Sequence, residues 1–365
     1  MTKTKKTRSV KKTISEKIDN FIQFSKPMIE LTEADYSAIR KVIDSGWVSI
    51  GKYMEKLEQY FIENYKVKHA IACSSCTQGL IIAMKAAGWR KKRIALPSFT
   101  WPSTVFAAES SGNIPIFCDI DPETWLIDLS LLSPKNYDAV VAVDVFGNQA
   151  QVKTDKPVIY DAAHGFGLKM LGKRGLAEVV SFSFTKVVTA MDGGMILTDD
   201  DEVADIAKEL RRLSSRMGEI NAVVCLRSLK NYKRNQELKL ENIQKYCELL
   251  SFEYTIQKIP VVTNHSVFSI VLPNQQMRDA IIKAFEENDI EVKAYYEPLV
   301  GGLPNTDSVF ARIISFPIYP AVKDHIAKIC DIANNAVAGT VDKYVQGKRY
   351  LVKSKYLTGY IQTAR

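Results

Sequence analysis

The 365-residue sequence is 46% hydrophobic and 25% charged, which is the composition of a globular protein. Its length is enough for one large domain and a smaller one. This balance excludes disorder as the main state of the chain. The sequence contains no uncharged apolar run of about 18 residues, the length that a membrane-spanning helix needs. Because the first residues also lack the apolar core of a signal peptide, we expect a cytoplasmic protein without membrane contacts.

The net charge of +8 resides at the two ends of the chain. Six bases lie in residues 1–12 and a net five more in residues 339–365, which leaves residues 13–338 with a net charge of −3. A basic groove built into the fold is therefore not predicted. The two basic ends could still contact an anionic polymer, so nucleic acid is an open but not a favoured partner.

The six cysteines are scattered along the chain, which indicates reduced thiols and no disulfide framework. Cys73 and Cys76 have the spacing of a redox pair or of half a metal site. A single pair without a second pair of ligands is weak evidence for either. We interpret both as structural thiols and predict no metal site.

In chain order, residues 27–66 show helical spacing of apolar residues and predict an entry arm with the first helix. Short β-rich runs then alternate with helical patterns up to residue 200, which predicts an α/β fold with a mostly parallel sheet covered by helices on both faces. In such a sheet, ligands bind at the carboxyl ends of the strands. The runs are 69–73, 93–97, 114–120, 138–146, 157–161, 179–184 and 194–198.

The second half of the chain predicts a smaller unit. Residues 201–250 are charged and helical, and the apolar runs and helical patterns of residues 267–338 predict a compact α+β unit. We therefore expect four parts, with one boundary near 215. They are a basic flexible tail (1–24), a large cofactor-binding domain with its N-terminal arm (25–215), a linking helix with a small C-terminal domain (216–338) and a basic C-terminal extension (339–365).

Three strand ends carry polar residues with a shared chemical meaning. Asp161 ends one apolar run, Lys186 follows another, and residues 73–80 place hydroxyl groups at the start of a helix. Taken singly, such a carboxylate is more often a cap and such a lysine is usually solvated. Together, an amine for a Schiff base, a carboxylate for a pyridinium nitrogen and a helix start for a phosphate predict pyridoxal 5'-phosphate as the cofactor.

These strand ends lie within longer motifs, and with them the chain resembles the DegT/DnrJ/EryC1/StrS sugar aminotransferase family of fold type I pyridoxal phosphate enzymes. The resemblance covers roughly residues 25–338 and is strongest in the first domain. It is carried by SGWVSIGKYMEKLEQYF (45–61), HAIACSSCTQGLIIAM (69–84), LPSFTWPSTVFAAESSGNIPIFCDIDPETWLID (96–128), VFGNQA (145–150), YDAAHGFG (160–167), SFSFTKVVTAMDGGMILTDD (181–200) and RMGEINA (216–222), with weaker matches at 293–299 and 314–320.

The resemblance implies roles for individual residues. Lys186 would bind the cofactor as a Schiff base and move the substrate proton, and Asp161 would keep the pyridine nitrogen protonated. Trp101 would stack on the cofactor ring, with a core tryptophan as the alternative, and His164 would lie near the ring oxygen. The implied cofactor site consists of Ser75, Cys76, Thr77, Trp101, Asp161, His164, Ser181 and Lys186, in which the hydroxyl residues and Cys76 form the phosphate end.

The chain departs from the family pattern at three places. Cys76 replaces a glycine in the phosphate turn, Met191-Asp192 replaces Gly-Glu, and Ser214-Ser215 replaces an Asn-Tyr pair that in the family reaches the partner subunit's active site. A dehydratase branch of the family carries histidine instead of the catalytic lysine. Since Lys186 is present, this branch is not favoured.

The resemblance implies a homodimeric aminotransferase that moves an amino group to a keto or aldehyde carbon of a sugar-like, nucleotide-linked acceptor. We expect glutamate as the amino donor. Two alternatives remain open at this point. One is an enzyme of the same fold acting on a modified nucleotide, a nucleic acid or an antibiotic precursor, and the other is a non-catalytic member of the fold.

Overall fold

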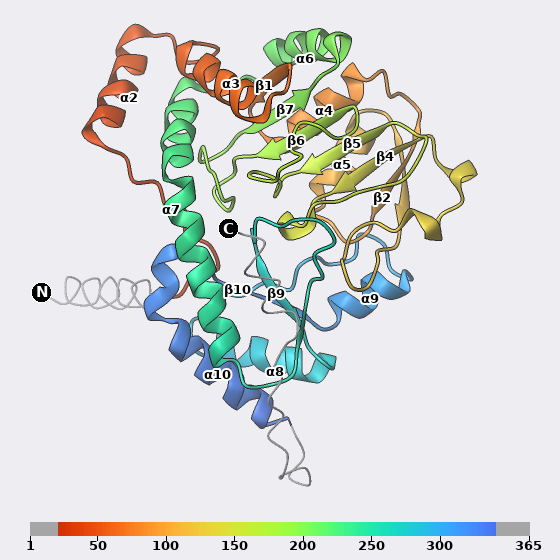
Figure 1. Ribbon diagram of the computed structural model, residues 1–365, viewed down its shortest axis with the longest axis vertical. Helices are drawn as coiled ribbons and strands as arrows, with labels where there is room; N and C mark the ends of the chain where they lie inside the picture. The colour runs from red at the N-terminus through yellow and green to blue at the C-terminus, as the bar shows by residue number, and fades with distance from the viewer. Residues whose placement is uncertain (1–20, 341–365) are drawn as a thin grey trace, which may run out of the picture.

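The computed structural model describes residues 21–340, so the predicted basic ends lie almost entirely outside the described residues (Figure 1). The first two helices, α2 (Glu33–Ser45) and α3 (Lys52–Tyr65), fall within the predicted helical region. α2 begins at a capping box of Thr32 and Asp35. α3 has no side-chain cap at its own start, and the carboxylate of Glu219 accepts hydrogen bonds from its first backbone N–H groups instead.

The large sheet has seven strands in the order β1-β7-β6-β5-β4-β2-β3. All neighbouring pairs are parallel except the two made by β7, which confirms the prediction of a mostly parallel sheet. Strands β4 to β7 consist entirely of buried residues, as expected for strands covered on both faces. The strands are β1 (His69–Cys73), β2 (Arg93–Pro97), β3 (Ile114–Cys118), β4 (Ala139–Val143), β5 (Val158–Ala162), β6 (Ala177–Ser181) and β7 (Gly194–Thr198).

Helices cover both faces of this sheet, as the sequence predicts. One face packs against α4 (Cys76–Ala86), α5 (Ser103–Ser110) and α6 (Asp201–Ser214) in a core that includes Leu80 and Ala204. The opposite face packs against α3 and the first half of α7 (Glu219–Leu249), with Phe61 and Cys225 in that core. The predicted helical region 201–250 is thus two helices, which separate at residues 215–218.

The second half of α7 leads to a smaller unit with its own core (Figure 1). Its antiparallel sheet has the order β10-β9-β8, and Tyr246 of α7 packs on Phe268 of β9 with ring centroids 5.7 Å apart. The elements are β8 (Thr255–Ile256), β9 (Phe268–Val271), α8 (Gln275–Glu286), α9 (Pro304–Phe310), β10 (Ile313–Phe316) and α10 (Ile326–Ala338). Short 3-10 helices span Leu129–Leu131, Pro134–Asn136, Val145–Gly147 and Pro320–Asp324.

The entry arm ahead of α2 contacts the smaller unit. The N–H of Ile22 donates to the carbonyl of Asp289 at 2.9 Å, and the N–H of Glu291 donates back to the carbonyl of Ile22 at 2.8 Å. Phe24 then lies edge-on to Tyr295, with ring centroids 5.6 Å apart. These contacts bring the arm to the space between the two sheets.

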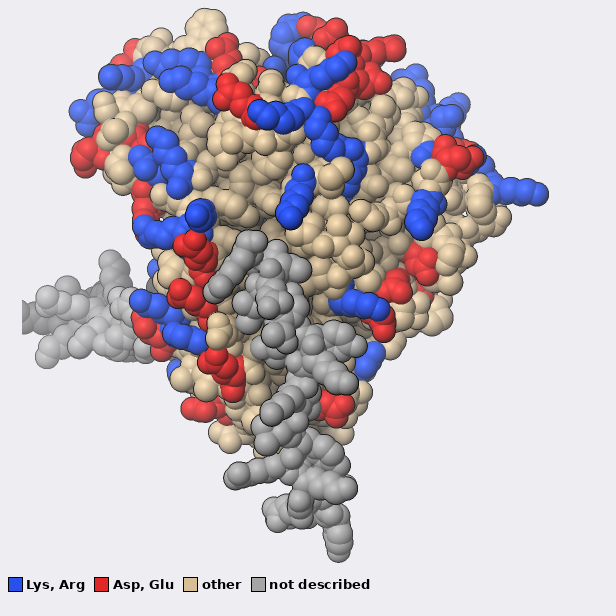
Figure 2. Space-filling model, in the orientation of Figure 1, with Lys and Arg blue, Asp and Glu red and all other residues tan. Residues whose placement is uncertain are grey.

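Charged side chains of both signs are mixed on the face shown in Figure 2. No continuous basic surface is visible among the described residues on this face, in line with the net charge of −3 for residues 13–338. Within residues 21–340, no helix has both the length and the apolar character needed to cross a membrane.

Candidate active site

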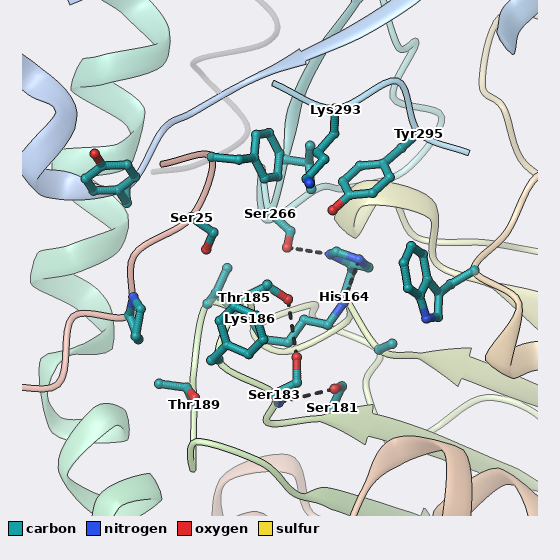
Figure 3. Close-up of a pocket in the computed structure, with 18 of the residues that line it drawn as sticks. Ser25, His164, Ser181, Ser183, Thr185, Lys186, Thr189, Ser266, Lys293 and Tyr295 are labelled. Atoms are coloured by element: carbon teal, nitrogen blue, oxygen red, sulfur yellow. Dashed lines mark hydrogen bonds between the residues drawn. The ribbon is translucent and has the colours of Figure 1, made fainter. Parts of the chain in front are cut away.

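The eight residues expected to form the cofactor site line one cavity of about 480 Å³ between the two sheets (Figure 3). They come from distant parts of the chain and meet because β1, β5 and β6 end at the same edge of the sheet. The residues are Ser75, Cys76, Thr77, Trp101, Asp161, His164, Ser181 and Lys186.

Lys186 lies in a tight turn after β6, where its N–H donates to the carbonyl of Ser183 at 3.0 Å. Its side chain points into the cavity, and Nζ lies 2.8 Å from Nε2 of His164 (Figure 3). Burial lowers the pKa of the Lys186 amine to about 8, an effect that Cys76 and Asp161 partly oppose. About a tenth of the amine is therefore in the neutral, nucleophilic form at pH 7, whereas a lysine with the ordinary pKa of 10.5 would be almost entirely charged.

Asp161 is held in a defined orientation at the end of β5. Its Oδ2 accepts a hydrogen bond of 2.7 Å from Oγ1 of Thr104, and its Oδ1 accepts one of 3.1 Å from the N–H of Ala163. The thiol of Cys76 makes a weaker contact of 3.9 Å with Oδ1. Burial raises the pKa of Asp161, whereas the bonds from Thr104 and Ala163 lower it. A cationic ring nitrogen next to this carboxylate would stabilise its charged form.

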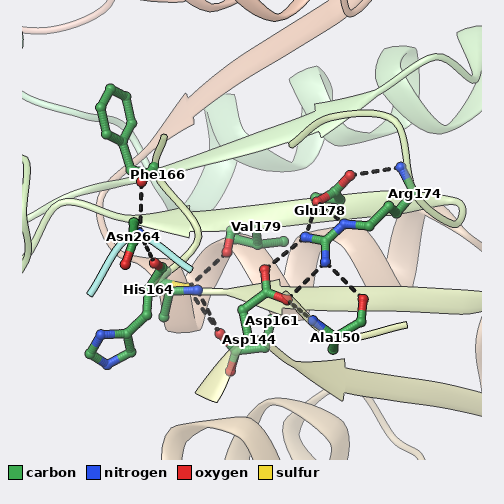
Figure 4. A network of polar contacts seen from close by, with 11 residues as sticks. Asp144, Ala150, Asp161, His164, Phe166, Arg174, Glu178, Val179 and Asn264 are labelled. Atoms are coloured by element: carbon green, nitrogen blue, oxygen red, sulfur yellow. Dashed lines mark hydrogen bonds and ion pairs between the residues drawn. The ribbon is translucent and has the colours of Figure 1, made fainter. Parts of the chain in front are cut away.

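A buried ion-pair network lies next to Asp161 in the sheet (Figure 4). Arg174 donates two hydrogen bonds, of 2.8 and 2.7 Å, to the carboxylate of Asp144 and also pairs with Glu178. Burial raises the pKa of Glu178 to about 7, and the charge of Arg174 opposes this rise. Arg174 thus compensates the negative charge of Asp144, which would otherwise disfavour the ionised form of Asp161.

His164 connects the large sheet to the smaller unit. Its Nδ1 lies 2.7 Å from Oγ of Ser266, and the hydroxyl of Tyr296 lies 3.3 Å from its Nε2. The amide of Asn264 donates to the backbone carbonyl of His164 and fixes the turn that carries it (Figure 4). Burial and the charges of Lys186 and Lys239 lower the pKa of His164 well below its usual value, so the ring is neutral at physiological pH.

The part of the cavity at the start of α4 offers hydrogen-bond donors that suit an anion. Ser75 caps α4, and its Oγ accepts a hydrogen bond from the N–H of Gln78 at 3.2 Å. Thr77 follows in the first turn of α4, where N–H groups without intrahelical partners and the helix dipole favour a phosphate. Ser181 adds a third hydroxyl from the end of β6. Gly194 permits the close approach of β7, because a Cβ atom there would lie 2.7 Å from the Cys76 nitrogen.

Trp101 is not a core tryptophan, so that alternative is wrong. Its side chain is 56% exposed and stands at the cavity wall, edge-on to Tyr295 with ring centroids 6.1 Å apart. This position lets the Trp101 ring contact a flat group in the cavity.

Sequence reasoning missed several residues of this site. Thr104 lies inside a quoted motif but received no role, and Tyr295 and Tyr296 lie in a segment where the resemblance is weak. Ser266 and Lys239 lie in segments without a motif, so no local signal identifies them. They join the site only because the smaller unit and α7 close over the sheet.

A sequence profile described as the DegT/DnrJ/EryC1/StrS aminotransferase family matches residues 30–333. The chain belongs to this family. This membership confirms the predicted fold, and it makes the chain a pyridoxal-phosphate-dependent aminotransferase.

Three relatives match the chain over most of their own lengths. The chain is 27% identical over 358 residues to the GDP-perosamine synthase of Vibrio cholerae, covering 85% of this chain and 97% of that protein. The structure of DesI with its TDP-sugar product is 25% identical, with a TM-score of 0.80 and coverage of 88% and 94%. The structure of NtdA from Bacillus subtilis, which holds pyridoxamine phosphate, is 20% identical, with a TM-score of 0.74 and coverage of 88% of each chain.

The donor groups in the cavity fit the family's cofactor. A buried amine, a buried carboxylate and a hydroxyl-rich helix start line the same space, and these are the groups that an aldehyde, a pyridinium nitrogen and a phosphate require. Cys76 does not obstruct this fit, because its thiol is directed toward the sheet, 3.9 Å from Oδ1 of Asp161 and 3.5 Å from the carbonyl of Val179.

Proposed function

We propose that this chain transfers an amino group from an amino acid, glutamate in the first instance, to a keto carbon of a nucleotide-linked sugar. The observation that carries the proposal is the convergence of Lys186, Asp161 and the hydroxyl groups at the start of α4 on one cavity. Two relatives support the acceptor class, because one is a GDP-perosamine synthase and the other is described with a TDP-sugar product.

The proposal assigns each residue a physical task. When bound, pyridoxal phosphate supplies a ring that accepts the electron pair left when the substrate Cα–H bond breaks. Lys186 would bind the cofactor and move the released proton between carbon atoms, a task that suits an amine whose pKa is about 8. Asp161 would keep the ring nitrogen protonated, and Trp101 would contact the ring. Ser75, Cys76, Thr77 and Ser181 would hold the phosphate.

We propose in addition that the enzyme is a homodimer. Exposed apolar side chains gather around the start of α7, where the carbonyl of Val48 accepts a hydrogen bond from Glu219 and Asn221 donates to the carbonyl of Ala190. Trp47 is 66% exposed there, and Met191 also presents apolar surface. This surface would be covered by a second copy of the chain.

Because nucleotide-linked sugars and free glutamate are cytoplasmic metabolites, we propose that the enzyme is cytoplasmic.

An absorbance experiment tests the proposed function. Purified protein loaded with pyridoxal phosphate should show the visible band of the lysine-bound cofactor, and excess glutamate should convert this band to the ultraviolet band of pyridoxamine phosphate. Lys186→Ala should abolish the visible band and lower turnover by at least about a thousand-fold. Lys169→Ala, at an exposed lysine of a neighbouring loop, is the matched control. A Lys186→Ala protein with wild-type turnover would refute the proposal.

A further inference from the structure

Four polar side chains share the inward face of α7, a face that is normally apolar. Ser228, Asn235, Lys239 and Asn242 are all buried, and their spacings of seven, four and three residues place them on one side of the helix. The outer two hold the fold together. Ser228 accepts a hydrogen bond from the N–H of Thr189, and Asn242 donates to the carbonyl of Tyr319.

The inner two side chains, Asn235 and Lys239, line the active-site cavity and carry hydrogen-bonding groups without partners among the described residues. They are 8% and 9% exposed, respectively. The side-chain amide of Asn235 has no hydrogen-bond partner among the described residues, and its Oδ1 atom is fully buried. Since an amide oxygen only accepts, the NH2 group of this side chain is the part that can donate to an anion. The ammonium of Lys239 contacts only the carbonyl of Ser266, at 3.3 Å, in the described part of the chain, although it can donate three hydrogen bonds.

Within residues 21–340, no acidic side chain of the cavity forms an ion pair with Lys239. Three acids line this cavity in the described structure, and each has another partner. Asp161 accepts from Thr104, Asp192 accepts from the N–H of Gly193, and Glu291 pairs with Lys293 at 2.7 Å. Burial alone lowers the pKa of Lys239 to about 7. A buried amine without a counter-charge is costly to the fold, which points to a charge supplied by a ligand.

Ser266 links this amine to the reacting end of the cavity. Its carbonyl accepts from Lys239, whereas its hydroxyl bonds to His164, which in turn lies 2.8 Å from Nζ of Lys186. A small ligand that reacts near Lys186 can therefore extend past Ser266 to Lys239. We propose that Lys239 and Asn235 form an oxyanion-binding subsite for the carboxylate of the amino donor or the phosphate of the acceptor. This inference rests on the proposed function and names the group that holds the far end of a substrate.

The test compares oxyanion binding to loaded holoenzyme by titration calorimetry at pH 7. The probes are 2-oxoglutarate for the donor carboxylate and GDP or TDP for the acceptor phosphates. Lys239→Met, which keeps the length but removes the charge, should weaken at least one probe by tenfold or more. Lys239→Arg should stay within about threefold of wild type. Lys245→Met, at an exposed lysine farther along α7, is the matched control and should bind like wild type.

The pattern of losses identifies the source of the oxyanion. A loss confined to 2-oxoglutarate assigns the subsite to the donor, a loss confined to the nucleotides assigns it to the acceptor, and a loss of both assigns it to either oxyanion in turn. Unchanged affinities in Lys239→Met, equal losses in Lys245→Met, or no binding of any probe to wild type would overturn the proposal. Asn235→Ala, which leaves the lysine in place, provides a second variant with an expected loss of about threefold.

The visible band of the lysine-bound cofactor separates this inference from the proposed function. It should form in wild type and in all four variants, because none of the substitutions touches Lys186. Absence of the band from wild type would refute the proposed function. Its presence together with unaltered probe affinities in Lys239→Met would refute the subsite alone.

Discussion

The Nζ atom of Lys186 and the Nε2 atom of His164 lie 2.8 Å apart in a buried cavity. The other ring nitrogen of His164 lies 2.7 Å from the hydroxyl of Ser266. Since the ring is neutral, an Nδ1–H that donates to Ser266 leaves a lone pair on Nε2 for the amine of Lys186. The smaller unit thus orients the lysine of the large sheet through one imidazole.

This pair predicts an effect on turnover. His164→Phe removes the acceptor for Lys186, and kcat should fall about tenfold to a hundredfold with KM little changed. His164→Gln, which restores a hydrogen-bonding group, should recover most of the loss. Steady-state kinetics of both variants, and of Ser266→Ala with a smaller expected loss, measure the effect. Wild-type kcat in His164→Phe would show that the contact is only structural.

The hydroxyl of Thr104 predicts a tuning of Asp161. Thr104→Val keeps the shape of the side chain but removes the 2.7 Å bond to the carboxylate, so the pKa of Asp161 should rise. We expect kcat to fall about tenfold and the acidic limb of its pH profile to move to higher pH. Thr100→Val removes only the hydrogen bond between the hydroxyl groups of Thr100 and Thr104, which lie 3.0 Å apart, and should have a smaller effect. An unshifted acidic limb in Thr104→Val would contradict the prediction.

Burial of Lys186 predicts how fast the protein without cofactor takes up pyridoxal phosphate. Only the neutral amine attacks the aldehyde, and the pKa of Lys186 is about 8 instead of 10.5. The loading rate should therefore rise about tenfold per pH unit below pH 8 and level off above it. Stopped-flow absorbance between pH 6.5 and 9.5 measures this rate, and a parallel series with propylamine corrects for ionisation of the aldehyde reagent. A rate that keeps rising about tenfold per pH unit up to pH 9.5 would contradict this prediction.

Lys239 predicts a pH-dependent cost to stability. The pKa of Lys239 is lowered from 10.5 to about 7 in the folded protein. Between pH 7 and 10.5 the unfolded chain therefore keeps a proton on this amine that the folded chain has lost. The cost is complete below pH 7 and disappears as pH rises toward 10.5. Lys239→Met should therefore raise the free energy of unfolding by up to about 5 kcal/mol at pH 6 and by little at pH 10. Denaturant unfolding at the two pH values measures the difference, and equal gains at both would contradict this assignment.

The exposed apolar surface near the start of α7 predicts the oligomeric state. Sedimentation should give a mass near twice the 41.0 kDa of one chain. Trp47→Glu places a charge in the proposed interface and should shift the protein toward monomer at micromolar concentration. Leu131→Glu, at an exposed apolar residue of the short helix Leu129–Leu131, is the control. A wild-type monomer, or a Trp47→Glu dimer of unchanged affinity, would refute the proposed interface.

Local sequence determined the strands and the choice of the proposed cofactor residues. Asp161 and Lys186 were found because a polar residue at the end of an apolar β-rich run is a local feature, and parallel strands bring such ends together. The helix start at Ser75 was visible for the same reason. Each of these signals depends on neighbouring residues and on a sheet whose topology follows from the alternation of strands and helices.

Only the tertiary structure decided which groups surround this cofactor site. Thr104 reaches Asp161 across 57 positions, and Ser266 reaches His164 across 102. A lone serine or lysine in a helical or apolar pattern has no local mark of function, and Lys239 on α7 is such a case. Its meaning arises from the burial of its amine without a counter-charge, and burial is a property of how α7 packs against both the large sheet and the smaller unit.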